Sequence, residues 1–268
     1  MPRTTSENWS SFAACSARGS KKMSIESPAD LAALREVGRI TRQTLDALEE
    51  RVRAGVTTGE LDAVAAAVFA RHGARSAPAL VYGFPATVLI SVNDEVVHGV
   101  PGARRLKRGD LVKLDVTVEK DGYVADAART VIVDEGTDAA KRLVACAEAA
   151  FQAGAAVAHA GTRVNEIGRA IEREVRRAGF AVVHGLTGHG VGRTIHEPPT
   201  VPNFYDPWLR DVLTEGLVLT IEPLICTGKA AAITDDDGWT VRTKDGGLAA
   251  HHEHTLVITR GTPVLLTA

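Results

Sequence analysis

The sequence predicts an α+β fold in which two related halves each supply two helices followed by a strand. Three observations lead to this prediction: a repeated sequence pattern, a segment that alternates apolar and polar residues on both sides of a tight turn, and acidic residues at matching strand positions. We expect a single domain over residues 23–268, with pseudo-symmetric halves at about 29–134 and 137–260. A twofold relation between the halves would bring matching strands to one centre.

The repeat covers a helix start and a later strand in each half. An Ala-Gly pair followed by a Glu-aliphatic pair at Ala54 to Leu61 recurs at Ala160 to Ile167. At nearly the same offset, Leu111 to Asp115 matches Val218 to Glu222. Each half is therefore expected to deliver one carboxylate to the centre.

The remaining elements follow from capping signals and hydrophobic period. Ser27, with proline after it, is a typical helix start, and Thr57 with Glu60 is in the register of a capping box. We predict helices over residues 29–53, 58–72, 138–159 and 164–178. Strands are predicted near residues 88–92, 111–118, 123–133, 181–186, 217–222 and 254–259.

The strand pair around Asp121-Gly122 brings two carboxylates together. Asp-Gly favours a two-residue hairpin turn, and counting back from it sets Thr117 opposite Asp126. Asp115 is then a diagonal neighbour of Asp126 on the polar face, at about 7 to 8 Å between backbones. Carboxylates at this separation can converge on two cations about 3.5 to 4 Å apart, whereas in an ordinary hairpin they would be a solvated face.

Five side chains with metal-binding chemistry follow one another along the chain. Glu222 ends an alternating strand at Pro223, which cannot continue a central ladder, so this carboxylate lies where strand pairing stops. Four carboxylates and one imidazole can hold two divalent cations, because bridging carboxylates serve both. The sequence therefore predicts metal-assisted hydrolysis at two cations, and cobalt, manganese, ferrous iron and zinc all stay open. The predicted ligands are Asp115, Asp126, His189, Glu222 and Glu253.

Glycines surround His189 in residues 185–192. Such a run can cradle a phosphate at a helix start, but two prolines follow here and leave no helix to face one. We interpret the glycines as allowing the backbone to approach a site closely. His98 and His196 each shortly precede a proline, and they are either structural residues or neighbours of the inferred pocket.

Composition favours a cytoplasmic enzyme. The 268 residues include 31 basic and 33 acidic side chains, a formal net charge of −2, so no basic field attracts nucleic acid or an anionic membrane. No apolar run approaches the roughly 20 residues that span a bilayer. Three cysteines without metal-site spacing, Cys15, Cys146 and Cys226, fit a reducing compartment, the last two as inert core thiols.

Residues 1–22 are predicted to be a disordered tail, because they lack helical periodicity. Residues 12–15 faintly resemble a lipoprotein cleavage site, but no apolar segment precedes them as export requires. Whether Met1 or Met23 is the start stays open.

The segments around these residues resemble those of the type I methionine aminopeptidases over roughly residues 25–266. Ligand identity, order and flanking sequence coincide, which makes the resemblance specific. It implies the pita-bread fold, a curved antiparallel sheet backed by helices. The matching segments are Ser91-Val-Asn-Asp-Glu-Val-Val-His98-Gly-Val-Pro101, Lys113-Leu-Asp115-Val116, Gly188-His189-Gly-Val-Gly192, His196-Glu-Pro198, Thr220-Ile-Glu222-Pro223 and Glu253-His254-Thr255.

The resemblance also divides the ligands between two metals. Asp115 would bind one metal, and His189 and Glu222 the other. Asp126 and Glu253 would bridge the two. Water or hydroxide activated by the metals would attack the carbonyl of an N-terminal methionine, and binding of the free amine would confine attack to the first peptide bond.

Catalysis and substrate binding would fall to side chains around the metals. Glu222, or alternatively Glu253, would shuttle the proton, while His98 and His196 would contact the substrate amide and stabilise the oxyanion. Each aromatic taken singly could equally be a core residue. The apolar pocket for the methionine thioether would be lined by Phe84, Leu89, Ile195 and Trp239, with Tyr82 and Val81 nearby.

Three other classes share parts of this pattern. Xaa-Pro aminopeptidases and prolidases share the ligand set but normally carry an extra N-terminal domain. Type II methionine aminopeptidases have a helical insertion that the short segment between His196 and Glu222 cannot hold. Non-catalytic relatives that bind ribosomes or nucleic acid have lost ligands, whereas all five are present here. We expect a monomeric enzyme acting on N-terminal methionine in peptides and nascent chains, and ribosome association is an expectation for such an enzyme.

Overall fold

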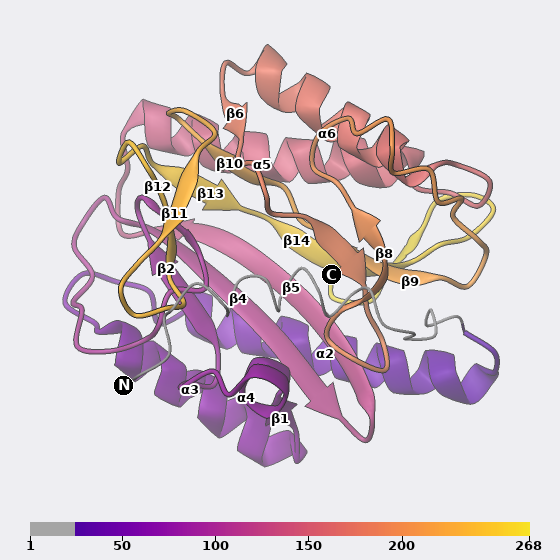
Figure 1. The fold of residues 1–268 in the computed structure, drawn as a ribbon. Coiled ribbons are helices and arrows are strands. Elements are labelled where there is room, and N and C mark those ends of the chain that lie inside the picture. Colours follow the sequence, from indigo (N-terminus) through magenta and orange to yellow (C-terminus); the bar gives the residue numbers. More distant parts are fainter. Residues whose placement is uncertain (1–24) are drawn as a thin grey trace, which may run out of the picture.

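The computed structural model describes residues 25–268, so the tail predicted for residues 1–22 lies outside the described residues. The helices of the first half are α2 (Pro28–Glu49) and α3 (Thr58–His72), followed by the short α4 (Ala77–Tyr82). The second half begins with α5 (Asp138–Val157) and α6 (Val164–Arg177). The predicted order of two helices before the strands is therefore present in both halves (Figure 1).

Local signals explain where these helices start and end. The Ser27 side chain accepts a hydrogen bond from the backbone of the first turn of α2, as a capping serine does. Thr57 and Glu60 form the capping box predicted for α3, and Gly73 ends that helix in the left-handed conformation at φ 60°. The α2 helix stops short of the predicted residue 53, because its last residues form turns instead.

The central sheet has nine strands within the described residues, and its paired strands are antiparallel. Its order is β1 (Arg75–Ser76), β4 (Leu111–Lys120), β5 (Tyr123–Ile132), β14 (Glu253–Val257), β9 (Val218–Ile221), β7 (Gly188–Gly190) and β8 (Glu197–Val201), with β2 (Leu89–Val92) also on β4 and β15 (Val264–Leu265) on β14. Two small sheets comprise β13 (Ala249–His251), β10 (Leu224–Cys226) and β6 (Ala181–Val182), and β11 (Ala232–Thr234), β12 (Val241–Thr243) and β3 (Glu95–Val97). Strands from both halves thus meet in one sheet, where β5 lies next to β14.

The β4–β5 hairpin has the predicted register. Lys120 pairs with Tyr123, and Thr117 lies opposite Asp126. Asp121 and Gly122 have φ of 53° and 80°, and two positive values define the turn type that Asp-Gly favours. This turn fixes which residues of the two strands face the same side.

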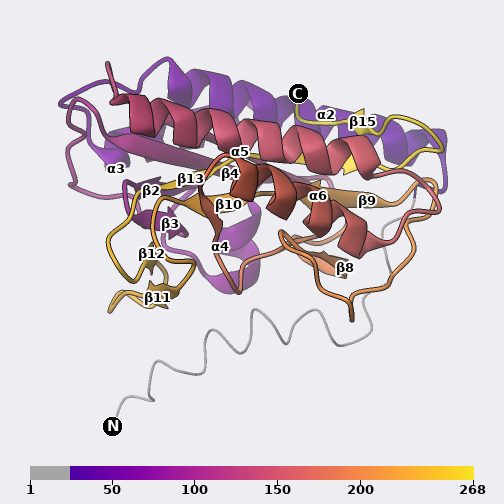
Figure 2. The ribbon, with the colours of Figure 1, turned by 90° about the horizontal axis from the view of Figure 1, so that it is seen from above.

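The long helices cover one face of the sheet, and short elements cover the other. The α2 helix packs against β4 and β5, and α5 packs against β5, β9 and β13. Figures 1 and 2 show α2 and α5 behind the sheet, with α4, β8 and β12 on its opposite side. Side chains of β4 that alternate away from α2 therefore face the region of the short elements.

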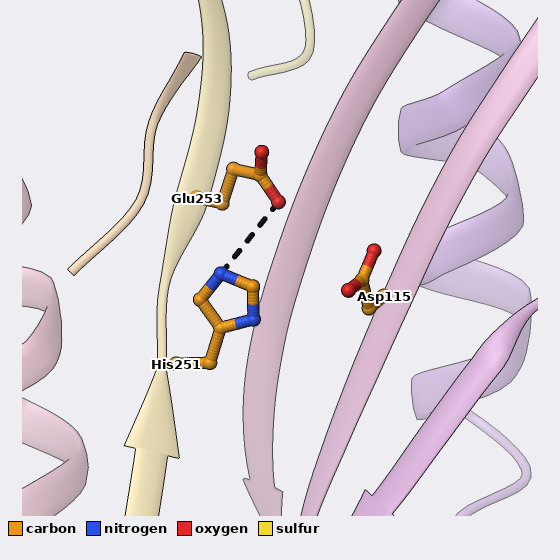
Figure 3. A group of neighbouring side chains, drawn as sticks. All are labelled: Asp115, His251 and Glu253. Atoms are coloured by element: carbon orange, nitrogen blue, oxygen red, sulfur yellow. Dashed lines mark ion pairs between the residues drawn. The ribbon is translucent and has the colours of Figure 1, made fainter. Parts of the chain in front are cut away.

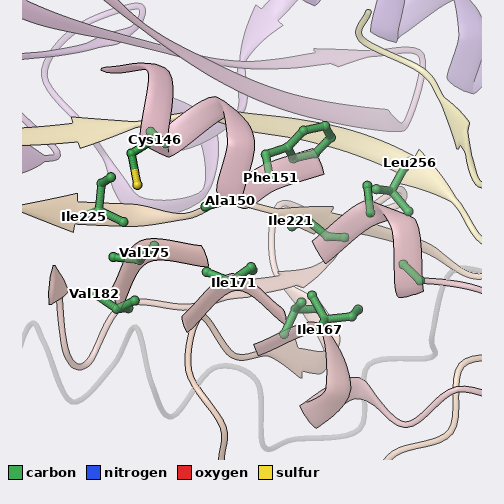
Figure 4. Packing of buried hydrophobic residues seen from close by; sticks show 14 of the residues in the cluster. Cys146, Ala150, Phe151, Ile167, Ile171, Val175, Val182, Ile221, Ile225 and Leu256 are labelled. Carbon is green, nitrogen blue, oxygen red and sulfur yellow. The ribbon is translucent and has the colours of Figure 1, made fainter. Parts of the chain in front are cut away.

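Apolar strand residues fill the space beneath the helices. Alternate residues from Val112 to Val118 on β4 pack under α2 and α3. In the second half, Phe151 of α5 and Ile167 of α6 pack with Ile221 and with β10 (Figure 4). Burial of each large apolar side chain contributes about 1.5 to 3 kcal/mol, so these cores hold the sheet firmly in place.

The sequence patterns missed the shortest elements. The strand predicted at residues 181–186 is limited to β6, because Gly185 adopts φ 83° and the chain leaves the strand conformation before it. Strands of two or three residues and the six-residue α4 are too short to show a period. Cys146 and Cys226 are buried thiols, as predicted, and Cys15 lies outside the described residues. Of the helices in residues 25–268, none is both long and apolar enough to cross a membrane.

Candidate metal centre

A cavity of about 340 Å³ opens on the face of β4 that points away from α2. Both halves of the chain contribute to its walls, together with α4 and the segment between β11 and β12. The structure thus gathers into one cavity residues that the sequence spreads over more than half of the chain. Its lining includes the predicted ligands Asp115, Asp126, His189, Glu222 and Glu253, the histidines His98 and His196, and Phe84, Leu89, Ile195, Trp239 and Tyr82.

The β4–β5 hairpin supplies Asp115 and Asp126. Both are buried, with 8% and 6% of their surface exposed. Thr117 Oγ1 donates to Asp126 Oδ1 at 2.9 Å, and the Asp126 backbone N–H donates to Thr255 Oγ1 at 2.9 Å. These bonds hold one carboxylate in a single orientation while its second oxygen stays available to the cavity.

His189 and Glu222 come from β7 and from the end of β9. A Cβ on Gly190 would lie 2.3 Å from the Pro198 carbonyl oxygen, so only glycine permits this close approach of β7 and β8. His189 Nδ1 lies 3.0 Å from the Gly190 carbonyl oxygen, which makes Nδ1 the donor and leaves Nε2 as the acceptor. Nε2 is 3.4 Å from Glu222 Oε1, to which Thr220 Oγ1 donates at 3.0 Å.

Glu253 joins the two ends of the cluster. Its carboxylate belongs to two groups in which the ligand atoms lie within 4.8 Å of one another, one with Asp126 and His189 and one with Asp115 and His251. Figure 3 shows the second group, with Asp115 across from Glu253 and His251. Glu253 Oε1 is buried and has no hydrogen-bond partner among the described residues. A buried carboxylate oxygen without a donor needs a positive partner, so this set of donors fits divalent cations.

The electrostatics of the cluster support the same fit. Burial, followed by the charge of Asp126, raises the pKa of Asp115, Glu222 and Glu253 well above their ordinary values. Burial also raises the pKa of Asp126 to about 7, although the hydrogen bond from Thr117 lowers it. Four ionised carboxylates are therefore unfavourable in this cavity by themselves, and cations would remove the penalty.

Two neutral imidazoles stand beside the carboxylates. His98 has φ 60°, a conformation that residues other than glycine rarely adopt, and a Cβ on Gly99 would come within 2.3 Å of the β2 backbone. The centroids of the His196 and His189 rings lie 4.2 Å apart. His196 Nδ1 hydrogen-bonds to the Tyr82 hydroxyl. Burial lowers the pKa of His98 to about 4 and that of His196 well below its ordinary value. Each ring can therefore donate one N–H near neutral pH.

An apolar wall closes another side of the cavity. Phe84 and Trp239 pack edge to face, with ring centroids 5.2 Å apart and an interplanar angle of 90°. Leu89 on β2 and Ile195 before β8 extend this wall, and both are buried. Val81 is 51% exposed and lies outside the lining, although the sequence suggested that it would be near.

Thr117, Thr220 and His251 were not among the site residues predicted from the sequence. Each threonine lies two residues from a predicted ligand in an alternating strand, and this spacing places it on the same face. That spacing is the signal that could have found them. The same spacing relates His251 to Glu253, although the two lie in β13 and β14.

Two helix pairs backing an antiparallel sheet, with a buried carboxylate and histidine cluster at its centre, define a metal-dependent hydrolase. The chain belongs to metallopeptidase family M24, whose family model matches residues 32–260. Among its relatives is a protein of Bacillus subtilis (strain 168) named methionine aminopeptidase 2, which is 41% identical over 91% of this chain and 99% of the relative.

Solved structures agree with this membership. The methionine aminopeptidase from Rickettsia prowazekii has a TM-score of 0.88 and 34% identity, over 92% of this chain and 100% of that chain. The prolidase from Pyrococcus furiosus has a TM-score of 0.75 at 22% identity and is covered over 66% of its length, a likeness of fold alone. The family resemblance and the α+β pita-bread fold predicted from the sequence are thereby confirmed, and the chain is a metallopeptidase.

Proposed function

We propose that this chain is a methionine aminopeptidase, which removes the N-terminal methionine from peptides and nascent proteins and prefers small second residues. One observation carries the proposal: a single cavity holds both the carboxylate cluster and an apolar wall. A methionine side chain on that wall would place its own backbone next to the cluster. Relatives that bear the name methionine aminopeptidase match nearly the whole chain.

The cluster would hold two divalent cations, of cobalt, manganese, ferrous iron or zinc. When bound, such ions polarise a scissile carbonyl and lower the pKa of water to about 7. The residues that would hold them are Asp115, Asp126, His189, Glu222 and Glu253.

Glu222 is the residue that moves the proton in this proposal. Its Oε1 accepts from Thr220 Oγ1 at 3.0 Å, so the carboxylate has a fixed orientation, and burial raises its pKa. A carboxylate held in one orientation beside the attacking water can take its proton and return it to the leaving amine. Glu253 is the alternative, although its place between the two ligand groups suits bridging better.

His98 and His196 donate hydrogen bonds to the substrate amide. The Tyr82 hydroxyl at His196 Nδ1 can donate its proton there, which keeps the ring proton on Nε2. A neutral imidazole N–H stabilises the negative charge that develops on the carbonyl oxygen. The strained backbone of His98 holds its ring at one position, which suits a donor that must meet a developing charge.

Specificity follows from the apolar wall. The edge-to-face pair of Phe84 and Trp239, with Leu89 and Ile195, suits an unbranched thioether and offers no charged partner to a longer polar side chain. We expect the substrate to be met in the cytoplasm, by a monomer, and close to the ribosome where nascent chains emerge.

The test is metal-dependent kinetics on tripeptides. The purified chain, loaded in turn with cobalt, manganese, ferrous iron or zinc, is expected to cleave Met-Ala-Ser and to slow as the second residue is enlarged. Ala-Pro-Ala is expected to stay intact. Cleavage of Ala-Pro-Ala in preference would instead assign a prolidase-like activity, and no hydrolysis by a folded, metal-loaded protein would refute both.

A further inference from the structure

We propose that His251 is a sixth protein ligand of the metal centre and binds the cation on the Asp115 side. The centre would then carry one imidazole at each end, His189 on one cation and His251 on the other. This inference rests on the proposed metal centre and adds a ligand that the sequence analysis did not include.

The first observation is the position of the His251 ring. It lies at the end of β13, is 1% exposed, and belongs with Asp115 and Glu253 to a group whose ligand atoms all lie within 4.8 Å of one another. Figure 3 shows the ring beside Glu253, with Asp115 on β4, which lies beyond β5 in the sheet. The backbone is fixed on both sides, because His251 N donates to Thr130 Oγ1 at 2.8 Å and Thr130 Oγ1 donates to His251 O at 2.7 Å.

The second observation is that the two ring nitrogens lack hydrogen-bond partners among the described residues. Neither Nδ1 nor Nε2 of His251 has a hydrogen-bond partner among the described residues, although both atoms are buried. A buried polar group without a partner is costly, so native structures provide one in nearly every case. The ring points at carboxylates that themselves need a cation, and one bound ion would satisfy both.

The separation between His251 and Glu253 is that of two atoms that share an ion, whereas the separation between His251 and Glu222 is longer. His251 Nε2 lies 3.6 Å from Glu253 Oε2 and 3.9 Å from Glu222 Oε2, which is too long for a hydrogen bond. Two ligand atoms at usual zinc distances and tetrahedral or slightly wider angles lie about 3.3 to 3.6 Å apart. His189 Nε2, a predicted ligand, stands in the same relation to Glu222 Oε1 at 3.4 Å. The two imidazoles thus hold equivalent places at opposite ends of the cluster.

A second imidazole changes which metal is preferred. Carboxylate-only ligation suits manganese and magnesium, whereas imidazole favours zinc, cobalt and iron. The Asp115 side should therefore bind zinc more tightly relative to manganese than a site built from carboxylates alone. Removing His251 should reduce the preference for zinc over manganese at one of the two cation sites. The preference of the other site should not change.

X-ray absorption of the zinc-loaded chain tests the proposal directly, because imidazole rings give a distinct outer-shell signal. With both histidines bound, the average should be about one imidazole per zinc, and with His189 alone about one per two zinc ions. This measurement needs no variant. An average near one half in the unaltered protein overturns the proposal.

The variant His251→Gln provides the thermodynamic test, with His252→Gln as its control. The His252 ring packs against Phe151 and His254, on the side of the strand away from the cluster. In calorimetric titration, His251→Gln should weaken zinc at one site by more than the about 10- to 100-fold expected for loss of an outer-shell partner, and manganese by less. Equal affinities in both variants would contradict direct ligation.

The test of His251 as a ligand can fail or succeed independently of the test of aminopeptidase activity. Two bound zinc ions with two imidazoles, in a protein that leaves Met-Ala-Ser intact, would uphold the ligand and refute the aminopeptidase. Cleavage of Met-Ala-Ser together with a single imidazole for two zinc ions would do the reverse.

Discussion

The two parts of the sheet that supply the proposed metal ligands are built in different ways. The β4–β5 hairpin pairs ten residues on each strand in an unbroken register. By contrast, β7 has three residues and β9 four, and the register of β7 shifts between His189 and Gly190. The hairpin therefore positions the backbones of Asp115 and Asp126 mainly through strand pairing, whereas His189 and Glu222 depend more on individual contacts.

A shared hydroxyl group and close backbone packing position His189 and Glu222. Thr220 Oγ1 donates to Glu222 and also accepts from the His189 backbone N–H at 3.1 Å, so one hydroxyl links the two ligands. The glycines beside His189 permit the close approach of neighbouring backbone. We infer that the hairpin side is preorganised, and that the short-strand side is the part of the centre most sensitive to small changes.

The largest expected effect is from Asp126→Asn, which removes the charge of a proposed bridging ligand on the hairpin side. Loss of several kcal/mol of metal-derived stabilisation corresponds to a fall in turnover of at least about 1000-fold. Metal content by mass spectrometry and turnover on Met-Ala-Ser measure it. Asp121→Asn, in the exposed turn of the same hairpin, is the control and should behave as the unaltered chain. Full activity of Asp126→Asn would disprove bridging.

Next in size is His98→Ala, which should lower turnover by about 100- to 10,000-fold while leaving metal content unchanged. The reason is that His98 is assigned to the substrate and lies outside the two ligand groups. His159→Ala on an exposed turn controls for loss of a histidine. Equal metal loss in His98→Ala and Asp126→Asn would remove the distinction between ligand and substrate contact.

Stability of the hairpin side is tested at Lys113. This side chain is 1% exposed, and its Nζ donates to the backbone carbonyls of Asn93 at 2.7 Å and Ala249 at 3.3 Å. Lys113→Met removes these two charged donations, although the Asn93 carbonyl still accepts from the Ala249 backbone N–H at 3.0 Å. The change should lower the free energy of unfolding by about 1 to 3 kcal/mol in urea titrations. The exposed Lys107→Met is the control. An unchanged midpoint would mean that this amino group does not join the segments.

Lys113 and His251 also show the limit of what could be predicted from the sequence. The hairpin was predictable because Asp-Gly and the alternation of β4 are local, and they fix the register of Asp115 against Asp126 without reference to distant residues. The order of the candidate ligands and their flanking motifs predicted the centre in the same way. The partners of Lys113 come from residues far along the chain, and only the folded structure brings them together.

The short strands were not predictable for a related reason. Strands β10 to β13 have three residues each and are held by pairing with distant segments, so their sequences carry no period of their own. A lone His251 is likewise more often structural than a ligand, and only its position beside Asp115 and Glu253 gives it meaning. The sequence therefore indicates chemistry well where motifs are local, and poorly where tertiary contacts create the environment.

A smaller effect on metal binding should distinguish the short-strand side of the centre from the hairpin side. Thr220→Val removes a hydroxyl that links two ligands, and it should weaken metal binding by about 10- to 100-fold. Thr117→Val removes one bond to Asp126, whose backbone remains held by the hairpin and by Thr255, and should cost less. Calorimetric titration of both variants with the same metal gives the ratio of their metal affinities. An equal or larger loss in Thr117→Val would contradict the preorganised hairpin.

The smallest effect concerns the metal-free protein and its pH dependence. Because burial raises the pKa of Asp126 to about 7, its ionised form destabilises the folded state above that pH, and the folded state regains stability as the group is protonated between about pH 7 and 4. Asp126→Asn mimics the protonated form and should melt a few degrees higher than the unaltered chain near pH 8, by a margin that shrinks toward pH 5. Thermal unfolding of both proteins in chelator measures that margin. A margin that stays constant with pH would mean that Asp126 does not titrate in this range, and that the hairpin tolerates its charge without cations.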